Sequence, residues 1–152
     1  MRRSYIVAIA IAVVLFLVIS ALLARAFSAN SAEQSAITAL VKAEARGDTN
    51  AVIDAIYGCR ASAACQRRAS DVATALKRPG AVSIIQLQPS TSFSIGPNSG
   101  TARVAWNVPG RPQPIVQCVR VRRTGSVISG LKVALLEVSR RIKSDTACPA
   151  RF

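Results

Sequence analysis

The hydrophobic pattern begins with one long apolar run near the start of the chain. From Tyr5 to Leu23 the sequence YIVAIAIAVVLFLVISALL contains no charge, Gly or Pro, and Arg2 and Arg3 precede it. At the rise of an α-helix this run is about 28 Å long, close to the hydrocarbon thickness of a bilayer. It predicts a transmembrane helix in the cell membrane. The arginines keep its N-terminal end in the cytoplasm, so the rest of the chain lies outside.

Cleavage of this segment is the alternative to an anchor. Ala24-Arg25-Ala26 has the small-x-small form of a cleavage site, and a cut there would release a secreted domain that starts at Phe27. The apolar run is longer than the roughly 7 to 15 residues of a cleaved signal. We therefore expect an uncleaved signal-anchor over residues 1 to 26 and one extracytoplasmic domain over residues 27 to 152.

Helical periodicity after the anchor predicts about three helices. The first covers residues 31 to 46, where Ser31 and Gln34 fit a capping box and Gly47 supplies the stop. A short second helix follows Asp48 or Thr49 and ends at Gly58, and a third ends before Pro79-Gly80. Apolar residues on one face of the first helix are Ile37, Leu40 and Val41.

Beyond Gly80 the period changes to two, which predicts antiparallel strands joined by hairpins. Residues 97 to 100 and Thr124-Gly125 are the expected turns, and a Pro-rich loop covers residues 108 to 114. The strand over residues 115 to 123 separates two faces, and the last strand lies within residues 127 to 138. Alternating positions are Val82, Ile84 and Leu87, then Phe93 and Ile95, then Ala102, Val104 and Trp106. In the strand over residues 115 to 123, Ile115, Val119 and Val121 oppose Cys118, Arg120 and Arg122.

Helices followed by hairpin-connected strands favour an α+β domain with helices packed on one face of an antiparallel sheet. The element order and the closing hairpin VQCVRVRRTGSVISGLKVALLEVSRRI resemble small actinobacterial exported proteins with the cone fold of nuclear transport factor 2 and ketosteroid isomerase. The likeness covers about residues 31 to 143 and contains no signature motif. It implies a cone-shaped domain in which a curved sheet wraps around a long helix, with a cavity at the open end.

The four cysteines all follow the apolar run, in what should be an oxidising compartment. Disulfides are expected, and three connectivities are open. Our hypothesis pairs Cys59 with Cys65 and Cys118 with Cys148. The first pair requires a turn between its members, because on one continuous helix they would point apart. The spacing fits no common zinc site and the chain has no His, so no metal and no cofactor are expected.

Charge is concentrated in the second half of the domain. Residues 27 to 71 hold five basic and five acidic groups, whereas residues 72 to 152 hold twelve basic groups against Glu137 and Asp145. A surface of this kind attracts polyanions such as anionic lipid or phosphate-bearing wall polymers. Nucleic acid is not expected, because no aromatic residues interleave the cations. The candidate surface consists of Arg120, Arg122, Arg123, Arg140, Arg141 and Lys143.

The chain contains few groups suited to catalysis. Acid–base chemistry near neutral pH most often uses His, and the chain has none. The resemblance to cone-fold isomerases implies a carboxylate with a Tyr donor, for which Glu137 and Tyr57 are the candidates. Trp106 completes the candidate pocket residues, although a lone Trp on an alternating strand is most often core packing. We therefore expect a non-enzymatic accessory protein at an envelope complex. The alternatives are a small-molecule-binding or isomerase-type cone domain and a secreted domain.

Overall fold

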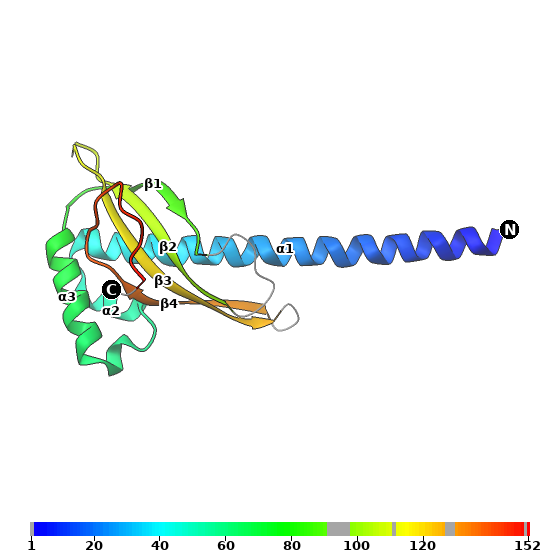
Figure 1. The fold of residues 1–152 in the computed structure, drawn as a ribbon, viewed down its shortest axis with the longest axis horizontal. Helices are drawn as coiled ribbons and strands as arrows, with labels where there is room; N and C mark the ends of the chain where they lie inside the picture. Colours follow the sequence, from blue (N-terminus) through cyan, green and yellow to red (C-terminus); the bar gives the residue numbers. More distant parts are fainter. Residues whose placement is uncertain (1, 91–97, 111, 127–129, 151) are drawn as a thin grey trace.

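One helix, α1 (Arg2–Arg46), contains both the apolar run and the first helix of the domain (Figure 1). Its stretch Tyr5–Ala24 has a mean hydropathy of 3.3 and is 0 % buried, so it is long and apolar enough to cross a membrane. The predicted helix start at Ser31 and Gln34 is wrong. Because the helix continues through this point, its N–H groups already have backbone partners and need no side-chain cap.

The predicted end of this helix at Gly47 is confirmed. Gly47 adopts a left-handed φ of 71°. Its N–H donates to the Glu44 carbonyl over 2.9 Å, and the Asp48 N–H donates to the Ala43 carbonyl over 3.0 Å. These two bonds are the paired arrangement that closes many helices, and the absence of a Cβ lets Gly47 adopt it without strain.

Two further helices follow, as the sequence predicts. Helix α2 (Thr49–Ala55) is capped by Asp48, and α3 (Ala63–Leu76) is capped by the Ser62 side chain, which accepts from the Cys65 N–H. A short 3-10 turn, η1 (Cys59–Ala61), lies between them. Gly58, with a φ of 73°, begins this turn, which supplies the change of direction that a bridge from Cys59 to Cys65 requires.

The structure is a computed structural model that describes residues 2–90, 98–110, 112–126, 130–150 and 152. Its sheet contains β1 (Ser83–Gln88), β2 (Asn98–Asn107), β3 (Ile115–Ser126) and β4 (Gly130–Val138) in the order β1-β2-β3-β4. All neighbours are antiparallel. The predicted α+β class is confirmed, since the described chain contains helices and a four-stranded antiparallel sheet (Figure 1).

Two predicted turns are parts of strands. β2 already begins at Asn98, and Gly100 lies inside it, where an added Cβ would be 2.3 Å from the Ser90 carbonyl oxygen. This glycine therefore marks a close backbone approach and not a turn. Thr124 and Gly125 are likewise paired in the β3–β4 ladder, which continues to Ser126. Phe93 and Ile95 lie outside the described residues.

The hydrophobic core lies between the helices and one face of the sheet. Val82, Ile84 and Leu87 all contribute from the β1 region, because a bulge between Ile84 and Gln86 shifts the alternation. The most deeply buried core side chains are Ile37, Leu40, Val52, Val104, Trp106 and Val119. Trp106 is thus a core residue, as the lone-Trp pattern favours.

Both hypothesised disulfides are confirmed. Cys59 bonds to Cys65 with a Cα–Cα distance of 5.2 Å, and Cys118 bonds to Cys148 with a Cα–Cα distance of 5.7 Å. The first bridge joins η1 to α3, and the second fixes the segment after β4 to the middle of the sheet. Both therefore stabilise the fold mainly by restricting the unfolded chain.

Candidate functional site

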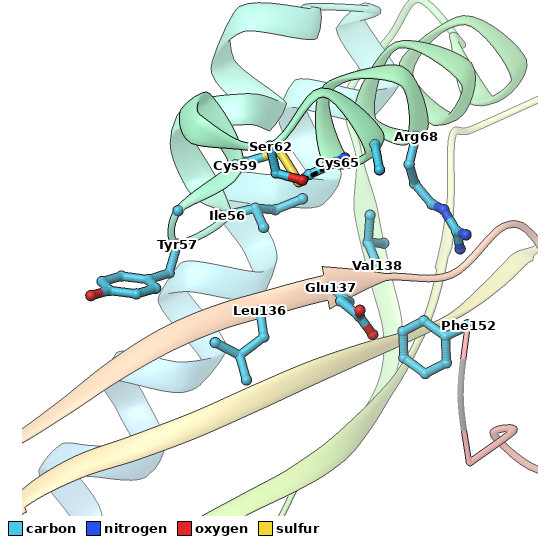
Figure 2. Close-up of a pocket in the computed structure, with 12 residues that line it drawn as sticks. Ile56, Tyr57, Cys59, Ser62, Cys65, Arg68, Leu136, Glu137, Val138 and Phe152 are labelled. Atoms are coloured by element: carbon cyan, nitrogen blue, oxygen red, sulfur yellow. Dashed lines mark hydrogen bonds between the residues drawn. A yellow bond between two sulfur atoms is a disulfide. The ribbon is translucent and has the colours of Figure 1, made fainter.

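A surface pocket of about 270 Å³ lies between the start of α3 and the end of β4 (Figure 2). The helical side of the pocket contains the Cys59–Cys65 bridge and Arg68, and the sheet side contains Leu136 and Glu137. Tyr57 and Phe152 also line the pocket, on opposite sides of Glu137 in Figure 2. The structure therefore brings together two of the three candidate pocket residues.

Tyr57 and Glu137 are both largely in solvent. The Tyr57 residue is 67 % exposed, and the Glu137 side chain is 46 % exposed and forms an ion pair with Arg120 over 3.2 Å. A general base gains reactivity near neutral pH when burial or a like charge disfavours its ionised form. An exposed carboxylate beside an arginine has neither influence, so this geometry does not favour proton abstraction.

A bulge in β4 explains why Glu137 points outward. Plain alternation from Leu135 would place Glu137 on the core face, but the ladder shifts so that Val121 pairs with Leu135 while Arg120 pairs with Glu137. Leu135 and Val138 then both enter the core, and Glu137 lies on the outer face. Trp106 does not line the pocket, since it is 0 % exposed and its indole N–H donates to the Gln117 carboxamide over 2.8 Å.

The candidate basic surface is divided among several environments. Arg120 and Arg122 lie on the outer face of β3, where their guanidinium groups sit 5.2 Å from the Phe152 ring and 5.1 Å from the Tyr57 ring respectively. Arg140 pairs with Asp71 over 3.3 Å, and Arg141 donates to Gln113 and to the Pro114 carbonyl. Lys143 is exposed. Three of the six cations, Arg140, Arg141 and Lys143, are thus exposed on the segment after β4.

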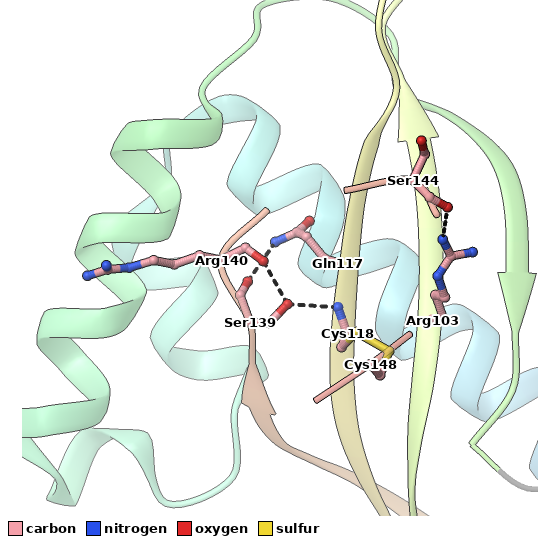
Figure 3. The surroundings of a disulfide bond; sticks show 7 residues. All are labelled: Arg103, Gln117, Cys118, Ser139, Arg140, Ser144 and Cys148. Carbon is pink, nitrogen blue, oxygen red and sulfur yellow. Dashed lines mark hydrogen bonds between the residues drawn. A yellow bond between two sulfur atoms is a disulfide. The ribbon is translucent and has the colours of Figure 1, made fainter. Parts of the chain in front are cut away.

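That segment covers the outer face of the sheet around the second disulfide (Figure 3). The Ser139 hydroxyl accepts from the Cys118 N–H over 2.9 Å and donates to the Arg140 carbonyl over 2.7 Å. Arg103 donates to the Ser144 carbonyl, and Arg120 donates to the Ala150 carbonyl over 2.6 Å. Arg103 of β2 and Arg120 of β3 therefore hold the segment in place.

Arg123 is not on the surface, which corrects our prediction. It is 4 % exposed and donates from Nη2 and Nε to the Glu33 carboxylate over 2.6 and 2.9 Å. Glu33, itself 0 % exposed, also accepts from the Ser90 N–H over 2.7 Å and from the Ser90 hydroxyl over 3.0 Å. Arg123 further donates to the Asn30 side chain over 3.2 Å. We call these four residues the Glu33–Arg123 clamp.

The clamp joins α1 to β3 and to the chain after β1. Its carboxylate accepts from two donor groups of Arg123 and two of Ser90, so the buried charge is neutralised and solvated by protein. Such a saturated ion pair has no free acceptor for chemistry, and its role is structural. The spacing of the two charged members indicates that both point into the domain. Arg123 continues the alternation of Val119 and Val121, and Glu33 precedes Ile37 by one helical turn.

A second acid, Glu44, is buried without a counter-ion. It is 0 % exposed, and its carboxylate oxygens accept no well-formed hydrogen bond from the described residues. Burial raises the pKa of Glu44 to about 8, an effect that the neighbouring Gln117 side chain opposes only in part. Glu44 is therefore uncharged in the folded protein at neutral pH.

Breaking the clamp from one side should strongly destabilise the domain. Arg123→Met leaves the Glu33 carboxylate buried and unpaired, which costs about 3 to 5 kcal/mol. Arg122→Met is the matched control, because among the described residues the side chain of that arginine makes only a ring contact, worth about 1 kcal/mol or less. Chemical unfolding of the full chain in detergent, followed by Trp106 fluorescence, measures both. Equal losses of stability would show that the clamp is not what holds β3 to α1.

Replacing Glu44 should stabilise the protein only at higher pH. The pKa of Glu44 is raised in the folded state from 4.5 to about 8, so the unfolded chain loses its proton first as pH rises. Wild-type stability then falls by about 1.4 kcal/mol per pH unit in this window, whereas Glu44→Gln escapes the loss.

The variant should therefore match wild type near about pH 5 and exceed it by about 4 kcal/mol near about pH 8.5. Leu40→Met, a neighbouring core change without a charge, should shift stability equally at both pH values. A pH-independent gain for Glu44→Gln would contradict burial of a neutral acid.

The chain matches no family model, no curated protein and no solved structure. Three features of its own residues bear on function: the uncovered apolar half of α1, the clamp at its other half, and the exposed cations on the segment after β4.

Proposed function

We propose that the protein is a single-pass, non-enzymatic accessory protein of the cell membrane whose extracytoplasmic domain binds an envelope partner or a polyanionic surface. The observation that carries this proposal is the continuity of α1. Its first half is apolar and 0 % buried, while Ile37, Leu40 and Val41 in its second half belong to the domain core. Apolar surface of this extent needs a cover, and a bilayer is the cover that its length fits.

Charge and cysteine chemistry support the orientation. Arg2 and Arg3 precede the apolar stretch, and positive charge at that end is typical of the cytoplasmic side. The domain then lies outside, where disulfides persist. Both disulfides of the described chain lie in the domain, on the far side of the apolar stretch from these arginines.

The excess of exposed cations supports a polyanionic partner. Among the acidic side chains of the described chain, Glu33, Asp54, Asp71 and Glu137 each pair with an arginine. Asp48 caps α2, Glu44 is buried as a neutral acid, and Asp145 is exposed on the segment after β4. Little negative charge remains to offset the exposed cations, so anionic lipid or wall polymers should be attracted to the domain.

We also propose that the domain has the cone fold of nuclear transport factor 2, as the likeness to small actinobacterial exported proteins implies. The support is the order of three helical segments before a four-stranded antiparallel sheet, with α1 against its inner face. Binding of a small molecule beside Tyr57 and Glu137 is the alternative function. We rank it second, because the pocket is slightly smaller than the roughly 300 to 1,000 Å³ of typical ligand sites.

Washing with alkaline carbonate should leave the full chain in the membrane fraction of cells that express it, because a spanning helix resists this treatment. Its intact mass should include the residues before Phe27. A soluble chain that starts at Phe27 would contradict the anchor and support release of a secreted domain.

Removal of exposed cations should weaken polyanion binding in a salt-dependent way. The full chain is placed in phosphatidylcholine nanodiscs, and poly(glycerol phosphate) is the probe. The triple variant Arg140→Ser, Arg141→Ser and Lys143→Ser should bind this probe several-fold more weakly at low salt, with a smaller loss at high salt. The control is the triple variant Lys42→Ser, Arg46→Ser and Lys77→Ser, which removes the same positive charge at another place. Equal losses for both triple variants would contradict a defined surface on the segment after β4.

A further inference from the structure

The sheet has two edges, and one of them is open. Strand β1 lies at the border of the sheet, next to β2 alone (Figure 1). The other edge strand, β4, receives a bond from its own chain, because the Tyr57 N–H donates to the Leu135 carbonyl over 2.7 Å. Within the part of the chain that the structure describes, β1 has backbone bonds only to β2. The N–H and C=O groups along its outer edge are therefore available to another strand.

Edge strands are usually protected by charged residues or proline, and β1 has neither. Its sequence is SIIQLQ, and no charged residue occurs from Pro79 to Ala102, although the chain holds 20 basic and 7 acidic residues. Its irregularity is the bulge between Ile84 and Gln86, after which regular pairing with β2 resumes. The intervening Ile85 is 59 % exposed, and beyond the apolar stretch of α1 it is the only exposed large aliphatic residue among the side chains that the structure describes. The open edge therefore offers an apolar contact together with its backbone groups.

The core is also incomplete beside this edge. Ile84 pairs with Trp106, and Leu87 pairs with Val104, across the β1–β2 ladder. The two β2 side chains are 0 % exposed, whereas Ile84 and Leu87 pack against the core but are only partly buried. Apolar residues of one more strand would lie beside them, because opposite neighbours on one face of a sheet are about 5 Å apart. An added strand would therefore bury apolar surface as well as pair the backbone.

Charge decides which kind of strand fits this edge. The nearest charged residues along the chain are basic on both sides, with Lys77 and Arg78 before β1 and Arg103 opposite Gln88 at its end. A second copy of the chain, paired antiparallel through its own β1, would bring Arg78 of one copy toward Arg103 of the other. A segment with acidic residues at its ends would meet opposite charge instead. The edge therefore fits an acidic partner segment better than a second copy.

We propose that the outer edge of β1 binds an extended segment of an envelope protein as an added strand. The segment has apolar residues at alternate positions, which contact Ile84 and Leu87, and acidic residues at both ends. Recognition of this kind takes its affinity from main-chain hydrogen bonds and its specificity from the alternate side chains. The inference rests on the proposed function as an accessory protein and identifies the part of the domain that the partner contacts.

A synthetic peptide tests the added strand. The probe is the fluorescein-labelled peptide DEVTVTVTED, added to the full chain in phosphatidylcholine nanodiscs. Fluorescence anisotropy measures its affinity, and amide hydrogen exchange measures protection of residues 83 to 88. The control peptide has the same sequence with N-methyl groups on its valines and threonines, which removes their backbone donors and keeps the charge. Ile85→Glu is the test variant. Tyr57→Glu is the matched control, because Tyr57 is also exposed and lies beside the other edge, at β4.

We expect the peptide to slow the exchange of residues 83 to 88 and the N-methylated peptide to leave it unchanged. Ile85→Glu should weaken binding of the peptide several-fold, whereas Tyr57→Glu should bind it as wild type does. Equal losses for both variants would show general attraction to a basic protein and overturn the added strand. Protection of residues 83 to 88 that rises with protein concentration in the absence of peptide would place a second copy at the edge, which also overturns it.

The polyanion probe separates this inference from the proposed function. A chain that binds poly(glycerol phosphate) but not the peptide overturns the added strand and leaves the proposed function standing. A chain that binds neither probe overturns both.

Discussion

The buried ion pair between Glu33 and Arg123 is the constraint on which the arrangement of this protein depends. It connects the helix to the sheet at the point where α1 leaves the core, and Ser90 attaches the chain after β1 to the same carboxylate. Without it the second half of α1 would still pack through Ile37 and Leu40, but the sheet would lose the ion pair that fixes its height on the helix. Because such a pair is costly to break from one side, it sets one geometry.

A single helix that contains both the apolar stretch and a core element has a mechanical consequence. No linker separates the apolar stretch from the domain, since α1 continues unbroken to Arg46. The direction of the helix therefore sets the direction of the domain. The outer face of the sheet is covered by the segment after β4, which the Cys118–Cys148 bridge and the bond from Arg120 to the Ala150 carbonyl hold in place.

Much of this fold can be predicted from the sequence, because the hydrophobic period and the Gly, Pro and capping residues determine where elements begin and end. Helix ends at Gly47 and before Pro79 and the strand with Trp106 follow from local signals, and the hypothesised disulfide pairing, one of three open connectivities, is the one in the structure. The predictions were wrong where a local signal competed with the regularity of the whole helix or strand. A good cap at Ser31 lost to helix continuity, and the charge of Arg123 concealed the strand spacing that places it inside.

The site was less readable, because it depends on contacts between distant segments. No local pattern reveals the bulge at Leu136 that turns Glu137 outward, nor the path that brings Arg103 to Ser144. Glu44 follows Leu40 by one turn and so belongs to the inner face, but only the packed structure shows that it lacks a counter-ion. Polar residues at core spacing were the signal that could have identified Glu33, Glu44 and Gln117.

Because α1 is unbroken, the apolar segment and the domain form one rigid body without a hinge between them. Amide hydrogen exchange of residues 25 to 33, measured on the full chain in lipid nanodiscs, tests it most directly. An unbroken helix held by the clamp predicts slow exchange throughout this stretch, comparable with that of residues 37 to 44, because each amide is hydrogen-bonded four residues back. Fast exchange confined to residues 25 to 33 would reveal a flexible joint and contradict the account.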